Sequence, residues 1–118
     1  MKAAGRRQKG LRFERAIVKT MQAHGLEAKR VPLSGAQEGY KGDVCMVGPT
    51  GDLTIEAKMR AGGQKQIREW LGVNDALVLG ADRQQPLVVL RLTDFCDLVA
   101  ESLNIPSIPG GGETDNES

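Results

Sequence analysis

Two carboxylates and an amine, Asp43, Glu56 and Lys58, are the side chains of this sequence whose types and spacing best suit catalysis. Acidic side chains that are held face to face repel each other unless a cation neutralises them. Their oxygens, with the backbone carbonyl of Ala57 as a further ligand, suit a hard divalent cation such as Mg²⁺ or Mn²⁺. Beside the ion, Lys58 can orient or deprotonate a water molecule and offset the charge that develops on a phosphate. The pattern therefore indicates metal-assisted hydrolysis of a phosphodiester bond.

A β-hairpin is the element that would position these residues. Residues 43–47 and 53–58 are rich in strand-forming residues, and the sequence GPTGD that joins them is a strong turn signal. Pairing Val47 with Asp52 across this turn sets the register of the two strands. The same register places the two carboxylates opposite each other and the amine on the same face of the second strand.

Glu14 is a third carboxylate, and its position is unusual. Residues 10–24 are expected to form a helix that Gly25 ends. At about 100° per residue, Glu14 falls in the middle of the apolar arc that includes Ile17 and Met21. A carboxylate there is costly unless something compensates it. We therefore expect Glu14 to reach into the same pocket and to share its cation.

A surface ion pair is the competing interpretation of the same residues. The pattern D-x(12)-E-x-K is short and occurs often by chance, and cross-strand pairs of charges are common on half-exposed sheets. Its context favours a site, because the pattern falls on a hairpin and follows a helix that carries an acid on its apolar side.

The order of the predicted elements is helix, three strands, helix, two strands and helix. This order indicates an α/β fold in which a mixed five-stranded sheet is flanked by helices on both faces. Residues 1–9 are expected to be a flexible basic arm, residues 10–103 a single domain, and residues 104–118 a disordered acidic tail. Beyond the hairpin, strands are expected at 26–31, 76–79 and 87–92, and helices at 10–24, 64–71 and from 93 or 94 to about 103.

The composition excludes several classes of protein. The 118 residues are 40% hydrophobic, which is enough for one modest core. No apolar run approaches the roughly 18 residues of a membrane span, and no secretory signal is evident, so we expect a cytoplasmic protein. Cys45 and Cys96 lie far apart and are expected to be buried thiols, not disulfide or zinc ligands. An aromatic content of 3% argues against a single-strand binder that stacks bases.

The charges are divided unevenly along the chain. Residues 1–65 hold 13 Lys and Arg and 6 Asp and Glu, a net charge of +7. Residues 66–118 hold 3 and 9, a net charge of −6. The first half is therefore the candidate surface for a polyanion, although solvated helix faces also carry such charges.

The region from Gly10 to Lys58 resembles the archaeal Holliday junction resolvases of the PD-(D/E)XK nuclease superfamily. The resemblance rests on KGLRFERAIVKTMQAHGLEAKRVPLSG, then KGDV, then LTIEAK. It implies a restriction-endonuclease-like core, and a metal site formed by Glu14, Asp43, Glu56 and Lys58.

Two more residues gain a role from the resemblance. Ser34 matches a serine that is associated with catalysis in that family, and Arg15 matches an arginine that contacts a DNA phosphate. The proline of the family motif is Gly42 here, which bears on the choice of substrate. The second half of the chain, which would supply the dimer surface, is shorter than in the family.

These observations predict an endonuclease that depends on Mg²⁺, with Mn²⁺ able to substitute, and that cuts branched DNA, foremost four-way junctions. The setting is a bacterial or phage-infected cell, with the enzyme of phage or prophage type. A homodimer is expected because a junction is cut on two strands at symmetric positions. The alternatives are a nuclease of the same fold that acts on flaps, nicks or duplex ends, and an inactive DNA-binding module. The expected catalytic residues are Glu14, Asp43, Glu56, Lys58 and Ser34, and the expected DNA contacts are Arg6, Arg7, Lys9, Arg15, Arg30, Lys41 and Arg60.

Overall fold

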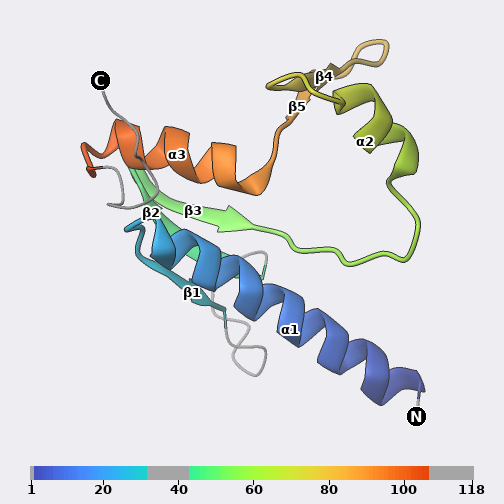
Figure 1. The fold of residues 1–118 in the computed structure, drawn as a ribbon, viewed down its shortest axis with the longest axis horizontal. Coiled ribbons are helices and arrows are strands. Elements are labelled where there is room, and N and C mark those ends of the chain that lie inside the picture. Colours follow the sequence, from blue (N-terminus) through green and yellow to red (C-terminus); the bar gives the residue numbers. More distant parts are fainter. Residues whose placement is uncertain (1, 32–42, 107–118) are drawn as a thin grey trace.

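The computed structural model describes residues 2–31 and 43–106, with side chains from Gln8 onward in the first range. Figure 1 shows the elements in the order that the sequence predicts, one helix, three strands, one helix, two strands and one helix. The elements are α1 (Lys2–Ala23), β1 (Ala28–Arg30), β2 (Val44–Gly48), β3 (Gly51–Ile55), α2 (Lys65–Leu71), β4 (Leu77–Leu79), β5 (Leu87–Val89) and α3 (Leu92–Ser102).

The first helix begins earlier than expected. It starts at Lys2 instead of residue 10, because residues 2–9 are mostly Ala, Arg, Gln and Lys, which favour helix, and include no proline. Its N-terminal part extends away from the rest of the fold (Figure 1). The predicted end is confirmed, since Gly25 has a φ of +84° and its N–H bonds to the Gln22 carbonyl.

Strands β1, β2 and β3 form an antiparallel sheet in that order. The predicted register of the hairpin is confirmed, because Val47 pairs with Asp52 and the pairing continues to Val44 with Ile55. Strand β2 lies in the centre of the sheet and is its most buried strand.

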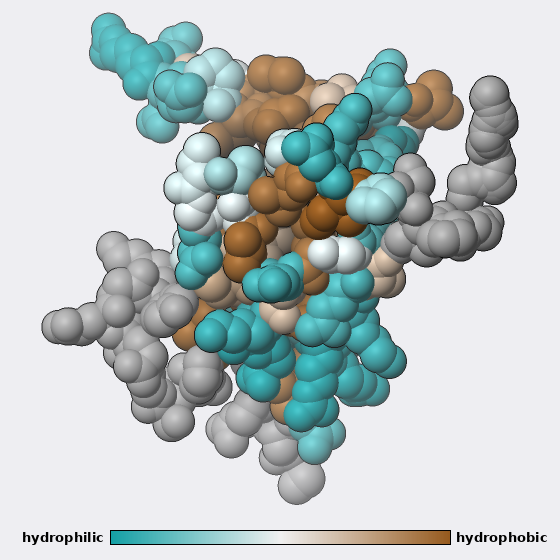
Figure 2. Space-filling view, turned by 90° about the vertical axis from the view of Figure 1, so that its left-hand side faces the viewer, coloured by the Kyte–Doolittle hydropathy of each residue, from teal (hydrophilic) through white to brown (hydrophobic). Residues whose placement is uncertain are grey.

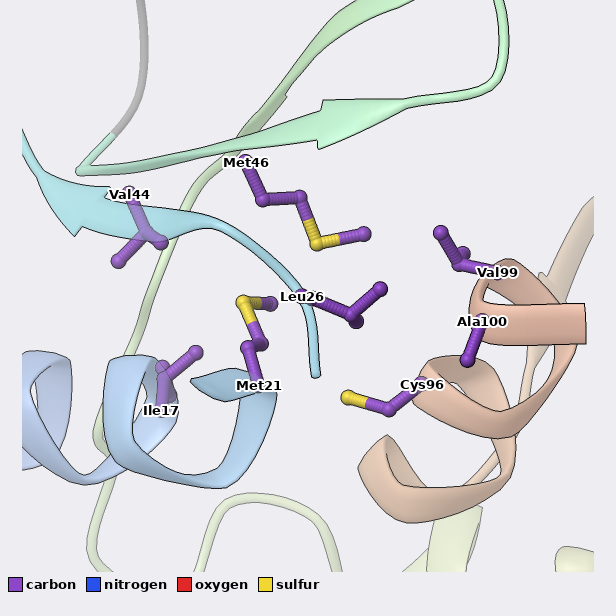
Figure 3. Close-up of a cluster of buried hydrophobic side chains, with 8 residues drawn as sticks. All are labelled: Ile17, Met21, Leu26, Val44, Met46, Cys96, Val99 and Ala100. Carbon is purple, nitrogen blue, oxygen red and sulfur yellow. The ribbon is translucent and has the colours of Figure 1, made fainter. Parts of the chain in front are cut away.

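One buried cluster joins α1, β2 and α3 on a single face of this sheet (Figure 3). Val44 and Met46 alternate along β2 and therefore point to that face, while Val47 points to the other and is exposed. The expectation of helices on both faces is thus wrong for the three-stranded sheet, because α1 and α3 contribute to the same cluster. Its members are Ile17, Met21, Leu26, Val44, Met46, Cys96, Val99 and Ala100.

A mixed five-stranded sheet is not formed by the described residues. Strands β4 and β5 pair only with each other, antiparallel, because the segment after β3 carries the chain away to α2 (Figure 1). Trp70, the large apolar side chain of α2, is 54% exposed for the same reason. The Arg91 side chain holds this region to α3 by donating to the backbone carbonyls of Gly72 and Asn74.

The start of α3 also differs from expectation. The helix begins at Leu92 instead of residue 93 or 94, and its N-cap residue is Arg91, without a side-chain hydrogen bond at the cap. His24, which directly follows α1, connects α1 to α3. Its Nε2 lies 3.3 Å from Asp97 on α3, and its Nδ1 lies 2.8 Å from the Thr20 carbonyl on α1.

Two methionines test where the core lies. Met21 is 0% exposed at the centre of the cluster, and Met59 is 50% exposed after β3. We expect Met21→Ala to lower the free energy of unfolding by about 2 to 5 kcal/mol, because it leaves a cavity. Met59→Ala should change it by about 0.5 kcal/mol or less. Urea denaturation measures both, and equal effects would contradict the placement of the core.

Candidate active site

Asp43 lies at the entrance to β2, between the two neighbouring strands. Its carbonyl accepts a hydrogen bond from the Val31 N–H at 2.9 Å, and its own N–H donates to the Ile55 carbonyl at 2.8 Å. These bonds fix the backbone of Asp43 at the end of the sheet where β3 finishes.

The Asp43 carboxylate bonds to the backbone that follows β3. Its Oδ2 accepts a hydrogen bond from the Ala57 N–H at 2.9 Å, and Ala57 lies between Glu56 and Lys58. The strand pairing ends one position earlier than expected, so the predicted Asp43–Glu56 pair is not part of the ladder. The bond nevertheless connects Asp43 to the segment that carries the other two residues of the pattern.

Glu56 and Lys58 form an ion pair with each other. The Lys58 Nζ lies 3.3 Å from Glu56 Oε2, and the two side chains are 64% and 57% exposed. This pair is the surface contact that the competing interpretation expects. An exposed pair contributes about 1 kcal/mol or less, so it rearranges readily when a stronger partner arrives.

Glu14 is compensated by an arginine. Arg30 Nε donates to Glu14 Oε1 at 3.1 Å, and the Glu14 side chain is 21% exposed. This ion pair accounts for the acid on the apolar side of α1. Within residues 2–31 and 43–106, no three His, Cys, Asp or Glu side chains form a group that could hold a metal ion. The expected meeting of three carboxylates is therefore not formed there.

The donor atoms at Asp43 nonetheless fit a hard divalent cation in chemistry. Among the described residues Oδ2 is engaged by Ala57, and no other hydrogen bond to this carboxylate is formed, so Oδ1 can face a cation. Glu56 adds carboxylate oxygens and Ala57 a backbone carbonyl on the adjacent segment, and oxygen ligands of this kind suit Mg²⁺. The fit rests on Asp43 and Glu56, with Glu14 held by Arg30.

Several predicted residues lie elsewhere or outside the described part. Lys9, Arg15 and Arg60 are exposed. Ser34, Lys41 and Gly42 lie outside the described residues, as do the side chains of Arg6 and Arg7.

A basic cleft adjoins the site, which we call the Lys58 cleft. It lies between α1 and the segment that leads into α2. Sequence reasoning missed Lys65 and Arg68 in its lining; their spacing of three on a short helix, next to Arg60, is the signal that would have found them. The lining includes Phe13, Lys58, Arg60, Lys65, Arg68 and Glu69.

The two thiols are not part of the site. Burial raises the pKa of the Cys45 thiol, and the neighbouring Asp52 raises it further. Burial, and then the charge of Asp97, raise the pKa of the Cys96 thiol. Both cysteines are free and buried, as predicted, and a raised pKa keeps them protonated and unreactive at neutral pH.

Comparison with known protein families shows which family this chain belongs to. A family model described as archaeal Holliday junction resolvase (Hjc) matches residues 5–70, more than half of the 118 residues. The chain belongs to the Hjc family. A search of curated proteins and a search of solved structures give no match.

The Hjc match contains every polar residue of the candidate site. It begins in α1 and ends in α2, so Glu14, Asp43, Glu56 and Lys58 all fall inside it, whereas β4, β5 and α3 fall outside. Membership in this family of junction-resolving endonucleases implies a restriction-endonuclease-like core, of which the structure shows helices with two small antiparallel sheets.

The bond between Asp43 and Ala57 can be tested through stability. We expect Asp43→Ala to lower the free energy of unfolding by about 1 to 2 kcal/mol, since the Ala57 N–H loses a charged acceptor. Asp43→Asn should cost less, because the amide oxygen can accept the same bond. Asp82→Ala, in the exposed turn between β4 and β5, is the control and should have almost no effect. Equal losses for Asp43→Ala and Asp82→Ala in urea denaturation would show that the bond contributes nothing.

Proposed function

We propose that this Hjc family member is a metal-dependent endonuclease that cuts branched DNA, foremost four-way junctions. The supporting observation is the Ala57 N–H bond to the Asp43 carboxylate, which connects an acid at the start of β2 to the Glu56–Lys58 segment. All of these residues lie within the family match. The same residue types in the same order are those that metal-assisted phosphodiester hydrolysis requires.

Asp43 and Glu56 would hold the cation, with the Ala57 carbonyl as a further ligand. We propose Mg²⁺ as the ion, with Mn²⁺ able to substitute, because the donors are all oxygen atoms. The ion supplies Lewis-acid chemistry at the phosphodiester when it is bound. Because the Asp43 backbone is bonded on both sides, its carboxylate is held in place before any ligand arrives.

Lys58 would act on the phosphate and the attacking water. Its ammonium pairs with Glu56 at 3.3 Å in the free protein, and the exposed pair opens at little cost. If the Glu56 carboxylate left this pair to bind a metal ion, the Lys58 ammonium could donate to a phosphate oxygen or hold the water that attacks the phosphate. The Lys58 cleft gives the phosphodiester a basic approach to this amine.

Glu14 and Ser34 would complete the catalytic set. Arg30 holds Glu14 through an ion pair at 3.1 Å, so a phosphate that attracts Arg30 would free Glu14 to serve as a third metal ligand. Ser34 is proposed from the resemblance of the loop before Asp43. The proposed DNA contacts are Arg6, Arg7, Lys9, Arg15, Arg30, Lys41 and Arg60.

A homodimer is proposed as the acting form. A junction must be cut on two strands at symmetric positions, and one chain carries one such site, so two copies related by a two-fold axis are needed. Exposed apolar side chains on the paired strands β4 and β5 and on α3 offer the shared surface. They are Val78, Leu87, Val88 and Leu98.

One observation favours a second candidate, an inactive DNA-binding module of the same fold. In the part of the chain that the structure describes, the three carboxylates are not gathered into a metal-binding group. A nuclease for flaps, nicks or duplex ends is a further alternative within the enzymes.

None of the described helices is long and apolar enough to cross a membrane. We propose a cytoplasmic protein of phage or prophage type.

Cleavage by Asp43→Asn tests the metal site. We expect loss of cleavage to background on a four-way junction with Mg²⁺, with DNA binding intact or stronger, because a negative charge near the phosphates is removed. Lys58→Ala should lose about 100-fold or more in turnover. Asp52→Asn, at the far end of the same hairpin, is the matched control and should cut normally. Retained Mg²⁺-dependent cutting by Asp43→Asn would refute the site assignment.

Light scattering tests the dimer. At micromolar concentration we expect twice the 12.7 kDa mass of one chain. Val88→Glu should reduce this to the mass of one chain, because it places a charge in the apolar surface, whereas Thr50→Glu in the β2–β3 turn should not. A single-chain mass for the unsubstituted protein, with junction cutting intact, would overturn the obligate dimer.

A further inference from the structure

A second basic surface lies on α1 and is not part of the Lys58 cleft. It is a hollow between α1 and β1, which we call the α1 hollow. None of the described residues that line it is acidic. Figure 2 shows hydrophilic side chains gathered over the lower part of the molecule, where α1 lies in Figure 1. The lining is Arg12, Arg15, Ala16, Val18, Lys19 and Arg30.

Three of these cations form a stripe along one side of the helix. Arg12, Arg15 and Lys19 are spaced by three and four residues, so they share one helix face, opposite the buried Ile17 and Met21. The stripe extends for about 10 Å along the helix, at 1.5 Å per residue. That length matches about three phosphates along one strand of a duplex.

The stripe carries charge that the described protein does not neutralise. Among the described residues, no acidic side chain pairs with Arg12, Arg15 or Lys19. Like charges at these spacings weaken a helix, and an anion that lies along them removes the repulsion. A solvated helix face would more often mix the two signs of charge.

The α1 hollow and the Lys58 cleft lie on different sides of α1. The cleft meets the helix at Phe13, whereas the hollow is lined along the helix by Arg12, Arg15, Ala16, Val18 and Lys19. At about 100° per residue, the mean direction of these five side chains lies about 130° around the helix from Phe13, so the two surfaces face different sides of α1. One straight duplex lying in the cleft would therefore leave the hollow empty, whereas a branched DNA has another arm to offer it.

We infer that the α1 stripe, Arg12 and Lys19 with Arg15, binds the phosphate backbone of a second duplex arm while the Lys58 cleft takes the strand that is cut. The inference rests on the proposed function and adds the residues that select branched over linear DNA. Arg12 and Lys19 are specificity residues that act through binding, so the chemical step does not depend on them.

Binding measurements on a double variant test this inference. Arg12→Gln with Lys19→Gln is compared with the unsubstituted chain on a four-way junction and on a linear duplex of the same sequence, in EDTA at several salt concentrations. We expect junction affinity to fall about tenfold or more, with the salt slope reduced by about two, while duplex affinity falls about threefold or less. Cleavage at saturating junction should be unchanged.

Controls separate this inference from the proposed function. Arg12→Gln alone is matched by Arg83→Gln, an exposed arginine in the β4–β5 turn, which should not alter the preference for junctions. Circular dichroism checks that α1 remains helical. An equal loss of affinity for junction and duplex, or no loss for either, would overturn the inference. If the unsubstituted chain bound junctions through the stripe and yet cut none, the proposed function would fail and the stripe assignment would stand.

Discussion

The hydrogen bond from the Ala57 N–H to the Asp43 carboxylate connects the two segments on which the candidate site depends, the start of β2 and the residues after β3. This bond forms at the end of the sheet where β2 begins and β3 has just ended. It requires the hairpin register that pairs Val47 with Asp52, because a shift by one residue would turn Asp43 to the other face. The buried side chains of β2 hold this register by packing against α1 and α3.

Each acid of the site has a different partner in the free protein. Glu14 is held by Arg30, Asp43 by a backbone amide and Glu56 by Lys58. The Glu56–Lys58 pair joins largely exposed side chains, so it is weak and open to exchange, whereas the Glu14–Arg30 pair is partly buried. A cation and a DNA phosphate offer stronger partners to the acids and to the bases respectively, and their arrival would bring the acids toward one another. In this account the site is assembled by its ligands around the fixed Asp43.

Local signals in the sequence predicted the order of the elements and the register of the hairpin that leads to Asp43. GPTGD gave the hairpin and its register, Gly25 gave the end of α1, and the placement of Glu14 on an apolar side showed that it needed a partner. The periodicity of the sequence could not identify the partner of Glu14. Arg30 is sixteen residues away on β1, and only the packing of α1 against β1 brings the two together.

The predictions that were wrong concern contacts between segments that are distant in the sequence. A five-stranded sheet requires β4 or β5 to reach an edge of the first sheet, and no short-range pattern reports where the segment after β3 leads. Trp70 is large and apolar, yet it is 54% exposed because α2 lies away from the main cluster. The apolar side of α1 is confirmed at Ile17 and Met21, which are buried, but the choice of sheet face depends on contacts between distant segments.

Cleavage of matched DNA substrates by the unsubstituted chain shows directly whether it is a Mg²⁺-dependent nuclease that selects junctions. A four-way junction, a flap and a linear duplex of related sequence are each incubated with Mg²⁺ or with EDTA. We expect symmetric cuts in the junction with Mg²⁺, much slower cutting of the linear duplex, and no cutting in EDTA. Equal cutting of all three substrates would contradict the proposed selectivity, and junction binding without any Mg²⁺-dependent cutting would identify an inactive binding module.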